Sequence, residues 1–288
     1  YAYDLSRNLE TQRLEGLPAA STCAAAFTNP PADARLVTTQ WHPDWRLETR
    51  RAEPRLITTW VYNGQGASCA PANALVDGKP IAVVCRRTEQ VTSDETGAAG
   101  FAAAVSGPAR TSTFTYNRWG QVLTSNGPRG DASDTVTYEY YADTQANWTQ
   151  GDLRQTTNAA GHVTRFTRYN RHGQVLERIE PNGLVTQYTY DLRQRLTRVQ
   201  VGDEVSTYEY DPVGNLTKVS LPEGGNLIYT YDPAHRLVAI QDQQGNHIDY
   251  TLDAMGNRIG EKTTDAAGVL RRNLMRTMDA LNRVQRVV

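Results

Sequence analysis

An internal repeat of about 21 residues constrains this 288-residue chain more than any other feature. The anchor of each unit is the second tyrosine of a Tyr-x-Tyr-Asp motif or its equivalent. In the most regular stretch the anchors are Tyr169, Tyr190, Tyr210, Tyr231 and Leu252, and more divergent units centre on Tyr3, Tyr62, Tyr116, Tyr140 and Met278. A unit this short cannot bury an apolar face by itself, so neighbouring units must stack to form a core.

Each unit has the sequence pattern of a β-hairpin. In residues 205–221, the alternating residues Tyr208 and Tyr210 favour a strand with an aromatic face. Asp211 then starts a turn that Gly214 can close in the left-handed conformation. A turn of this kind predicts a hairpin whose loop ends in a bulge.

Two parts of this pattern depart from an ideal hairpin. Leu216 and Val219 both read as apolar strand residues, yet they are three positions apart, which breaks strict alternation. Either a bulge absorbs the extra residue or Leu216 belongs to the turn. At the turn-closing position, Gln194 and His235 replace Gly at a greater conformational cost, whereas Asn282 tolerates the left-handed conformation better.

The recurring positions are predicted to be structural. The tyrosine and leucine columns should stack the hairpins, and the aspartate and glycine columns should hold the turns. These repeat-signature residues are Tyr188, Tyr190, Asp191, Tyr208, Tyr210, Asp211, Gly214, Leu216, Tyr229, Tyr231, Asp232, Leu237, Tyr250, Asp253 and Gly256.

The repeat predicts an all-β fold in which tandem hairpins form one long antiparallel sheet. A sheet of about twenty strands is too large to stay flat, so it should coil. The sequence divides into an irregular region with inserted loops, residues 1–112, and a regular repeat region, residues 113–288.

The irregular region contains all three cysteines of the chain. Cys69 and Cys85 bracket a loop and could form a disulfide if the chain is exported, with Cys23 left over. The alternative is that these residues are small buried thiols. Spacing along the chain gives no distance between sulfur atoms, so both interpretations stay open.

Composition argues against several classes of function. With 30 Lys and Arg against 31 Asp and Glu, the net charge is −1, which disfavours charge-driven binding of nucleic acid. No stretch approaches the roughly 18 apolar residues of a membrane span. The ends carry neither an initiator Met nor a signal peptide, so we expect a segment of a longer chain, with any targeting signal elsewhere.

No sequence motif predicts a catalytic or cofactor site. The sequence has no G-x-S-x-G nucleophile elbow and no Walker A loop. The 5 His residues are scattered without metal-ligand spacing, and the repeated Asp residues suit turn capping better than calcium binding. We therefore predict no catalytic residue, no metal and no cofactor, and we expect that the chain is not an enzyme.

Two segments resemble the YD repeats of the Rhs (rearrangement hotspot) family. They are YDPVGNLTKVSLPEGG at residues 210–225 and YTLDAMGNRIGE at residues 250–261. The resemblance is strong over residues 113–288, and the block from Cys69 to Cys85 resembles inserts in proteobacterial members. Eukaryotic teneurins and the C components of insecticidal toxin complexes share the repeat. The resemblance implies a β-sheet that spirals into a hollow shell around a variable C-terminal toxin domain.

The resemblance also implies a function and a set of partners. The expected function is a non-catalytic wall of the shell, which shields the toxin domain for delivery to competing cells. The expected partners are the remaining shell repeats of the same polypeptide, the enclosed toxin domain and components of a secretion system. The expected location is bacterial: secreted, on the cell surface or delivered into a target cell.

Family members often cleave themselves at a motif ending in Asp-Pro-x-Gly-Leu. Residues 211–215 match this motif only in part and lie inside a repeat, so no protease role is assigned to them.

Two other classes of function compete with the shell. A surface adhesin or fibre could bind carbohydrate through the tyrosine ladder formed by Tyr188, Tyr208, Tyr229 and Tyr250. An enzyme on a β-solenoid, such as a polysaccharide lyase, is the third class, but the sequence offers no convergent acid–base set for it.

Overall fold

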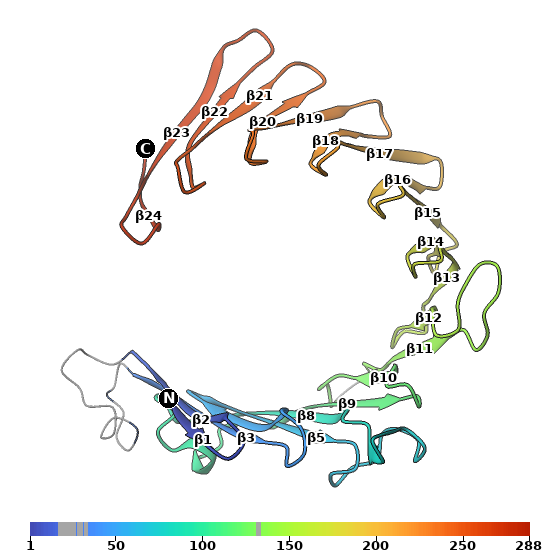
Figure 1. The fold of residues 1–288 in the computed structure, drawn as a ribbon, viewed down its shortest axis with the longest axis vertical. Helices are drawn as coiled ribbons and strands as arrows, with labels where there is room; N and C mark the ends of the chain where they lie inside the picture. Colours follow the sequence, from blue (N-terminus) through green and yellow to red (C-terminus); the bar gives the residue numbers. More distant parts are fainter. Residues whose placement is uncertain (17–26, 28–30, 32–33, 131–133) are drawn as a thin grey trace. The chain divides into compact units, whose positions relative to one another are not determined.

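The structure, a computed structural model, describes residues 1–16, 27, 31, 34–130 and 134–288. Over these residues the chain is built from antiparallel β-strands, with a short 3-10 turn, η1, at Gly100–Ala102 (Figure 1). The chain divides into two compact units. The first comprises Tyr1–Tyr140 and Leu153–Val163, and the second comprises Tyr141–Asp152 and Thr164–Val288.

The strands of the first unit pair antiparallel in chain order, except that β5 pairs with β8 across an inserted loop. They are β1 (Ala2–Asp4), β2 (Leu9–Glu15), β3 (Arg35–Trp41), β4 (Glu48–Glu53), β5 (Leu56–Tyr62), β8 (Val84–Val91), β9 (Arg110–Tyr116), β10 (Val122–Asn126), β11 (Val136–Tyr140) and β12 (Leu153–Thr157). Inside the loop, β6 (Leu75–Val76) and β7 (Lys79–Pro80) form a separate ribbon. A small core of Ala52, Ile57 and Ala103, with Phe101 against it, lies in this unit.

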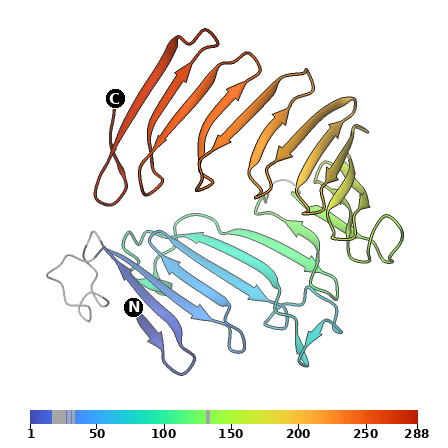
Figure 2. The same cartoon turned by 45° about the horizontal axis from the view of Figure 1, so that its top comes forward.

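The second unit is a run of hairpins in which each strand pairs antiparallel with the next (Figure 2). Its strands are β13 (Val163–Tyr169), β14 (Val175–Ile179), β15 (Val185–Tyr190), β16 (Leu196–Val201), β17 (Glu204–Tyr210), β18 (Leu216–Ser220), β19 (Asn226–Tyr231), β20 (Leu237–Asp242), β21 (His247–Leu252), β22 (Arg258–Thr264), β23 (Leu270–Met278) and β24 (Val284–Val287). The predicted all-β fold of antiparallel hairpins is confirmed.

The strand register gives the second unit two different faces. Tyr190 lies opposite Leu196 and Tyr188 opposite Val199, so these side chains share an aromatic and aliphatic face. Thr189 lies opposite Arg198, on the polar face. Most of these side chains are half-buried. The described strands of this unit contact their neighbours in the sheet, and no other described strand lies over the tyrosine face.

The register also decides whether Leu216 belongs to the turn or to the second strand of its hairpin. Tyr210 pairs with Leu216 and Glu209 pairs with Lys218, which leaves Thr217 as an extra residue. Leu216 is therefore the first residue of β18, and a bulge follows it. The hydroxyl of Thr217 donates a hydrogen bond to the backbone oxygen of Glu209 at 3.2 Å, which ties the bulged residue to the opposite strand.

The two compact units are defined by contacts, whereas the predicted division at residues 112 and 113 is defined by sequence regularity. That division stays a prediction about where regular repeats begin. In the first unit, Cys69 and Cys85 form a disulfide, with Cα atoms 5.4 Å apart. Cys23 lies outside the described residues. No helix within the described ranges is long and apolar enough to cross a membrane.

Candidate functional site

The turn that begins at Asp211 shows how one side chain organises a hairpin end. Its Oδ1 atom accepts hydrogen bonds from the backbone N–H groups of Val213, Gly214 and Asn215, at 3.1, 2.7 and 2.8 Å. The backbone N–H of Gly214 also donates to the backbone oxygen of Asp211 at 3.1 Å. The carboxylate thus occupies donors that the turn would otherwise leave to solvent.

The residue four positions after the anchor is left-handed in every regular unit. The φ angles are 80° at Gly120, 77° at Gly173, 65° at Gln194, 112° at Gly214, 61° at His235, 89° at Gly256 and 58° at Asn282. Gln194 and His235 therefore adopt the conformation that the sequence pattern identified as costly for them. The repeat geometry imposes this conformation even where Gly is missing.

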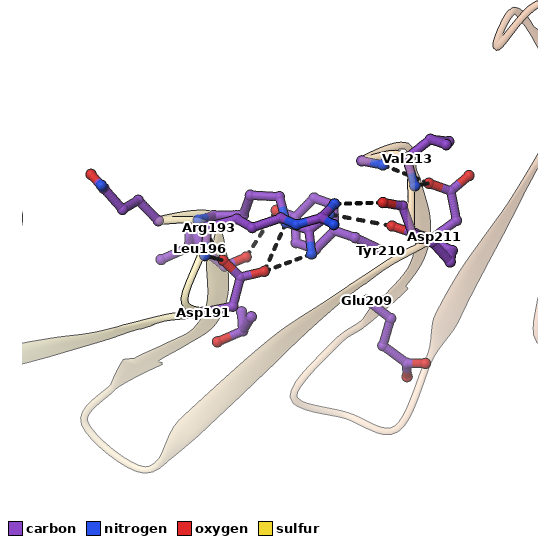
Figure 3. Close-up of polar contacts among 12 residues, drawn as sticks. Asp191, Arg193, Leu196, Glu209, Tyr210, Asp211 and Val213 are labelled. Atoms are coloured by element: carbon purple, nitrogen blue, oxygen red, sulfur yellow. Dashed lines mark hydrogen bonds and ion pairs between the residues drawn. The ribbon is translucent and has the colours of Figure 1, made fainter.

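A second column, five positions after the anchor, links the turns of the regular units to one another, and the sequence interpretation missed it. Arg195 donates from Nε to Oδ2 of Asp191 at 2.7 Å, within its own turn. Its Nη1 donates to the backbone oxygen of Asp211, in the next turn, at 3.3 Å. Figure 3 shows the two turns, with Asp191 in one and Asp211 in the other. Arg236 repeats the arrangement, bonding Asp232 at 2.7 Å and the backbone oxygen of Asp253 at 3.2 Å.

Amide side chains make the same connection in the other units. Asn215 donates to Asp211 at 2.7 Å and lies 3.2 Å from Nδ1 of His235, in the next turn. Gln174 reaches the backbone oxygen of Gln194 at 2.9 Å. We call these residues the clasp column: Gln174, Arg195, Asn215, Arg236 and Asn257. Their shared signal in the sequence is a long or amide-bearing donor directly after the turn-closing residue.

The anchor tyrosines provide a third link between consecutive units. The hydroxyl of Tyr210 donates to the backbone oxygen of Leu196 at 2.8 Å, and that of Tyr231 donates to Leu216 at 2.9 Å. The first unit shows the same bond from Tyr140 to the backbone oxygen of Val122, at 2.9 Å. In Figure 3 Tyr210 lies beside the turn that follows Asp191, and the guanidinium of Arg195 covers its ring at 4.6 Å.

The electrostatics of the turns follow from these bonds. The backbone N–H of Arg195, assisted by its guanidinium, lowers the pKa of Asp191 below its usual 3.8. The backbone N–H of Arg236 lowers the pKa of Asp232 in the same way. Burial of the ring raises the pKa of the Tyr210 hydroxyl above 10.0. The turn carboxylates are therefore held ionised and the anchor hydroxyl is held neutral.

The remaining signature residues lie where the repeat requires them. Leu237 faces Tyr231 across the hairpin, and Asp253 caps its turn with help from the side-chain amide of Asn257 at 2.8 Å. The ladder tyrosines Tyr188, Tyr208, Tyr229 and Tyr250 are half-buried, one in each successive hairpin. The guanidinium of Arg258 covers the ring of Tyr250 at 3.6 Å. The contacts of Leu237 and Arg258 join neighbouring strands, and the bond between Asp253 and Asn257 closes a turn.

The described residues form no cluster that could bind a metal ion. In residues 1–16, 27, 31, 34–130 and 134–288, no group of three or more His, Cys, Asp and Glu side chains could hold a metal ion. The chemistry that this arrangement supports is hydrogen bonding between repeats.

The disulfide of the first unit ties its inserted loop to the sheet. The backbone N–H of Cys69 donates to the side chain of Asn63 at 3.1 Å, and its backbone oxygen accepts from Tyr116 at 2.7 Å. Cys85 lies in β8 and is buried. The cystine therefore connects the loop to two strands.

Part of the repeat region matches a known family model. The RHS Repeat family model matches residues 169–206, 210–246 and 231–270. A comparison with curated proteins gave no match.

Solved structures show a similar fold. The crystal structure of TcdB2-TccC3-Cdc42 is 16% identical with a TM-score of 0.60, and the alignment covers 87% of this chain and 14% of that one. TcdB2-TccC3 without its hypervariable C-terminal region is 17% identical with a TM-score of 0.60, at coverages of 87% and 14%. TcdB2-TccC3 is 16% identical with a TM-score of 0.57, at coverages of 89% and 16%. This chain therefore shares their fold over a small part of their length.

Proposed function

Because residues 169–206 and 210–270 of this chain are RHS repeats, we propose that it is a non-catalytic wall segment of a hollow shell around a toxin domain. The shell would shield that domain until it is delivered to a competing cell. The other partners would be the remaining repeats of the same polypeptide and components of a secretion system. The protein would then be bacterial, and secreted, on the cell surface or delivered into its target.

The observation that carries this proposal is the bare tyrosine face of the second unit. Tyr188, Tyr190 and Leu196 share a face that no other described strand covers. A sheet face rich in aromatic and aliphatic groups is stabilised when another surface removes it from water. An enclosed polypeptide would supply that surface. One solved structure with this fold is described as lacking a hypervariable C-terminal region, which is the kind of segment that the shell would enclose.

Cryo-electron microscopy of the full-length polypeptide tests the proposal. A closed wall around weak internal density would support it, because an enclosed but unfolded domain has no single conformation. An open rod with nothing enclosed would contradict it. Deleting the C-terminal variable region should remove the internal density and leave the wall unchanged.

A carbohydrate-binding adhesin is the second candidate, and the half-buried tyrosine ladder favours it. Aromatic rings that are partly open to solvent can stack on sugar rings. Chemical modification of tyrosines in the intact protein separates the two functions. A shell with cargo would protect Tyr188 and Tyr208, whereas an adhesin would expose them and glycans would slow their modification.

A further inference from the structure

A cavity of about 430 Å³ lies between the turns that follow Tyr169 and Tyr190. Its lining includes three arginines and a histidine, Arg168, Arg171, Arg198 and His172, together with the apolar side chains Leu176 and Leu192. Arg168 lies in β13 before the first turn, Arg171 lies within that turn, and Arg198 comes from β16. The cavity thus combines several cations with a small amount of apolar surface.

The carboxylates near this cavity do not cancel the positive charge of its three arginines. Asp191 also lines the cavity, but its Oδ2 atom is occupied by Arg195 at 2.7 Å. Glu177 lies opposite Arg168, and its two oxygens accept bonds from Thr167 at 2.7 Å and Gln187 at 3.0 Å. Glu177 offsets one of the three guanidinium charges, and guanidinium groups do not lose their protons in proteins. A net positive charge remains.

The arginines of the lining make few bonds to each other or to neighbours. Arg198 donates to the side chain of Gln200 at 2.6 Å, and Nε of Arg171 donates to Nε2 of His172 at 3.2 Å. With Nε2 as an acceptor, a neutral His172 carries its proton on Nδ1 and can donate from there. Each guanidinium keeps further N–H groups available for a ligand.

The repeat itself shows that the fold does not need these arginines. The position of Arg168 is held elsewhere by Thr115, Thr189, Glu209, Thr230, Thr251 and Thr277. The position of Arg171 is held elsewhere by Arg118, Leu192, Pro212, Pro233, Ala254 and Ala280. The position of Arg198 is held by Lys218, Ala239 and Gly260 in the following units. The three arginines converge at one hairpin pair, although the same backbone geometry forms without them.

We propose that this cavity binds a phosphate group, either as free phosphate or as a phosphate monoester of a small molecule. Guanidinium groups bind the oxygens of phosphate in pairs, and a dianion matches the charge that remains after Glu177 is counted. The cavity is large enough for a body beyond the phosphate, and Leu176 provides an apolar contact for it, while the fully exposed Leu192 lies at the open rim. The phosphate site is a property beyond the proposed wall function, and its proposal does not depend on that function.

Isothermal titration of the full-length protein tests the site with two probes, inorganic phosphate and ribose 5-phosphate. Both should bind if the phosphate alone is recognised, and tighter binding of the ester would identify a monoester as the ligand. Arg168→Thr combined with Arg171→Ala should weaken binding at least tenfold. Both substitutions install residues that other units already carry, so circular dichroism and the melting temperature should match those of the wild type.

Two further variants make the test specific. Arg198→Lys keeps the charge but removes the paired donors, and it should also weaken binding. Lys218→Ala, at the equivalent position of the next unit, is the matched control and should leave binding unchanged. The proposal is wrong if neither probe binds at millimolar concentration or if Lys218→Ala weakens binding as much as the double variant. Tighter binding of a glutamate-rich peptide than of either phosphate would overturn it as well.

Discussion

At the scale of single residues, the aspartate or asparagine that follows the anchor organises the turn through its side-chain oxygen. Asp211 accepts three backbone N–H bonds through one oxygen and a side-chain amide through the other. The turn-closing residue then completes the loop in the left-handed conformation, at a φ of 112° for Gly214. The two residues act together. The backbone N–H groups of the turn point toward the carboxylate only when the turn-closing residue is left-handed.

Gly214→Val should destabilise the second unit by about 2 kcal/mol, since a β-branched residue strongly disfavours a positive φ angle. Gly214→Asn is the matched control, because Asn282 occupies the equivalent position at a φ of 58°. Urea denaturation of both variants measures the difference. A valine variant that unfolds at the wild-type urea concentration would disprove the turn assignment.

Acid should weaken the hairpin ends. Hydrogen bonds lower the folded-state pKa values of Asp191 and Asp232 below 3.8, so these groups stabilise the fold above that pH. Their contribution is lost as the pH falls below 3.8 and through the lower folded values. Denaturation between pH 7 and pH 2 should show this loss, and Asp191→Asn should reduce its steepness. A steepness that Asp191→Asn leaves unchanged would count against the prediction.

The two tyrosine columns should differ in what their hydroxyls contribute. Tyr210→Phe removes a bond to the backbone oxygen of Leu196, so it should cost about 1 kcal/mol. Tyr208→Phe is the control, because the hydroxyl of Tyr208 makes no hydrogen bond to any part of the chain that the structure describes. Equal unfolding free energies for the two variants would show that the anchor hydroxyl bond is not a stabilising link.

At the scale of elements, consecutive hairpins are joined in two ways. Backbone pairing joins β16 to β17, and the clasp column joins the turns at their ends. Backbone pairing follows from the strand pattern alone. The clasp depends on a side chain in one turn reaching the backbone oxygen of the next, and it therefore ties the turns of adjacent hairpins to each other.

Arg195→Ala should destabilise the second unit by about 1 kcal/mol, because its ion pair with Asp191 is partly open to solvent. Hydrogen exchange should rise at the turns following Tyr190 and Tyr210 more than in the strand centres. Arg195→Lys should recover part of the loss, since lysine keeps the charge without the paired donors. Uniform exchange across the unit would indicate a global effect and contradict the clasp.

At the scale of the whole molecule, the two compact units differ in what stabilises them. The first unit has the small apolar core and the disulfide, which closes a loop with a sequence separation of 16. The second unit depends on strand pairing, turn capping and clasps. We expect two unfolding transitions, because each unit has its own set of contacts.

Reductant should lower the stability of the first unit and leave the second unchanged. A disulfide across a loop of this size contributes about 3 kcal/mol through the unfolded state. Thermal unfolding with and without dithiothreitol, paired with a free-thiol assay, measures this effect. If the oxidised protein shows three free thiols, or if both transitions shift equally, the predicted role of Cys69 and Cys85 is wrong.

The hairpins, the turns and the left-handed positions were predictable from the sequence, because each depends on residues within a few positions of one another. Tyr208, Tyr210, Asp211 and Gly214 specify a strand and a turn locally. The place of the bulge at Thr217 was not predictable, since two local interpretations satisfied the same apolar pattern and the pairing partner of Glu209 decided between them.

The sequence by itself determined the repeat, the all-β class and the turn chemistry, because a period of about 21 residues repeats the same local preferences. Only the tertiary structure decided which turns exchange hydrogen bonds and which side chains share a cavity. Arg195 reaches the backbone oxygen of Asp211, and Arg168 meets Arg198 at one cavity, because sheet pairing brings separate units side by side. Such contacts depend on register between strands, which no single repeat encodes.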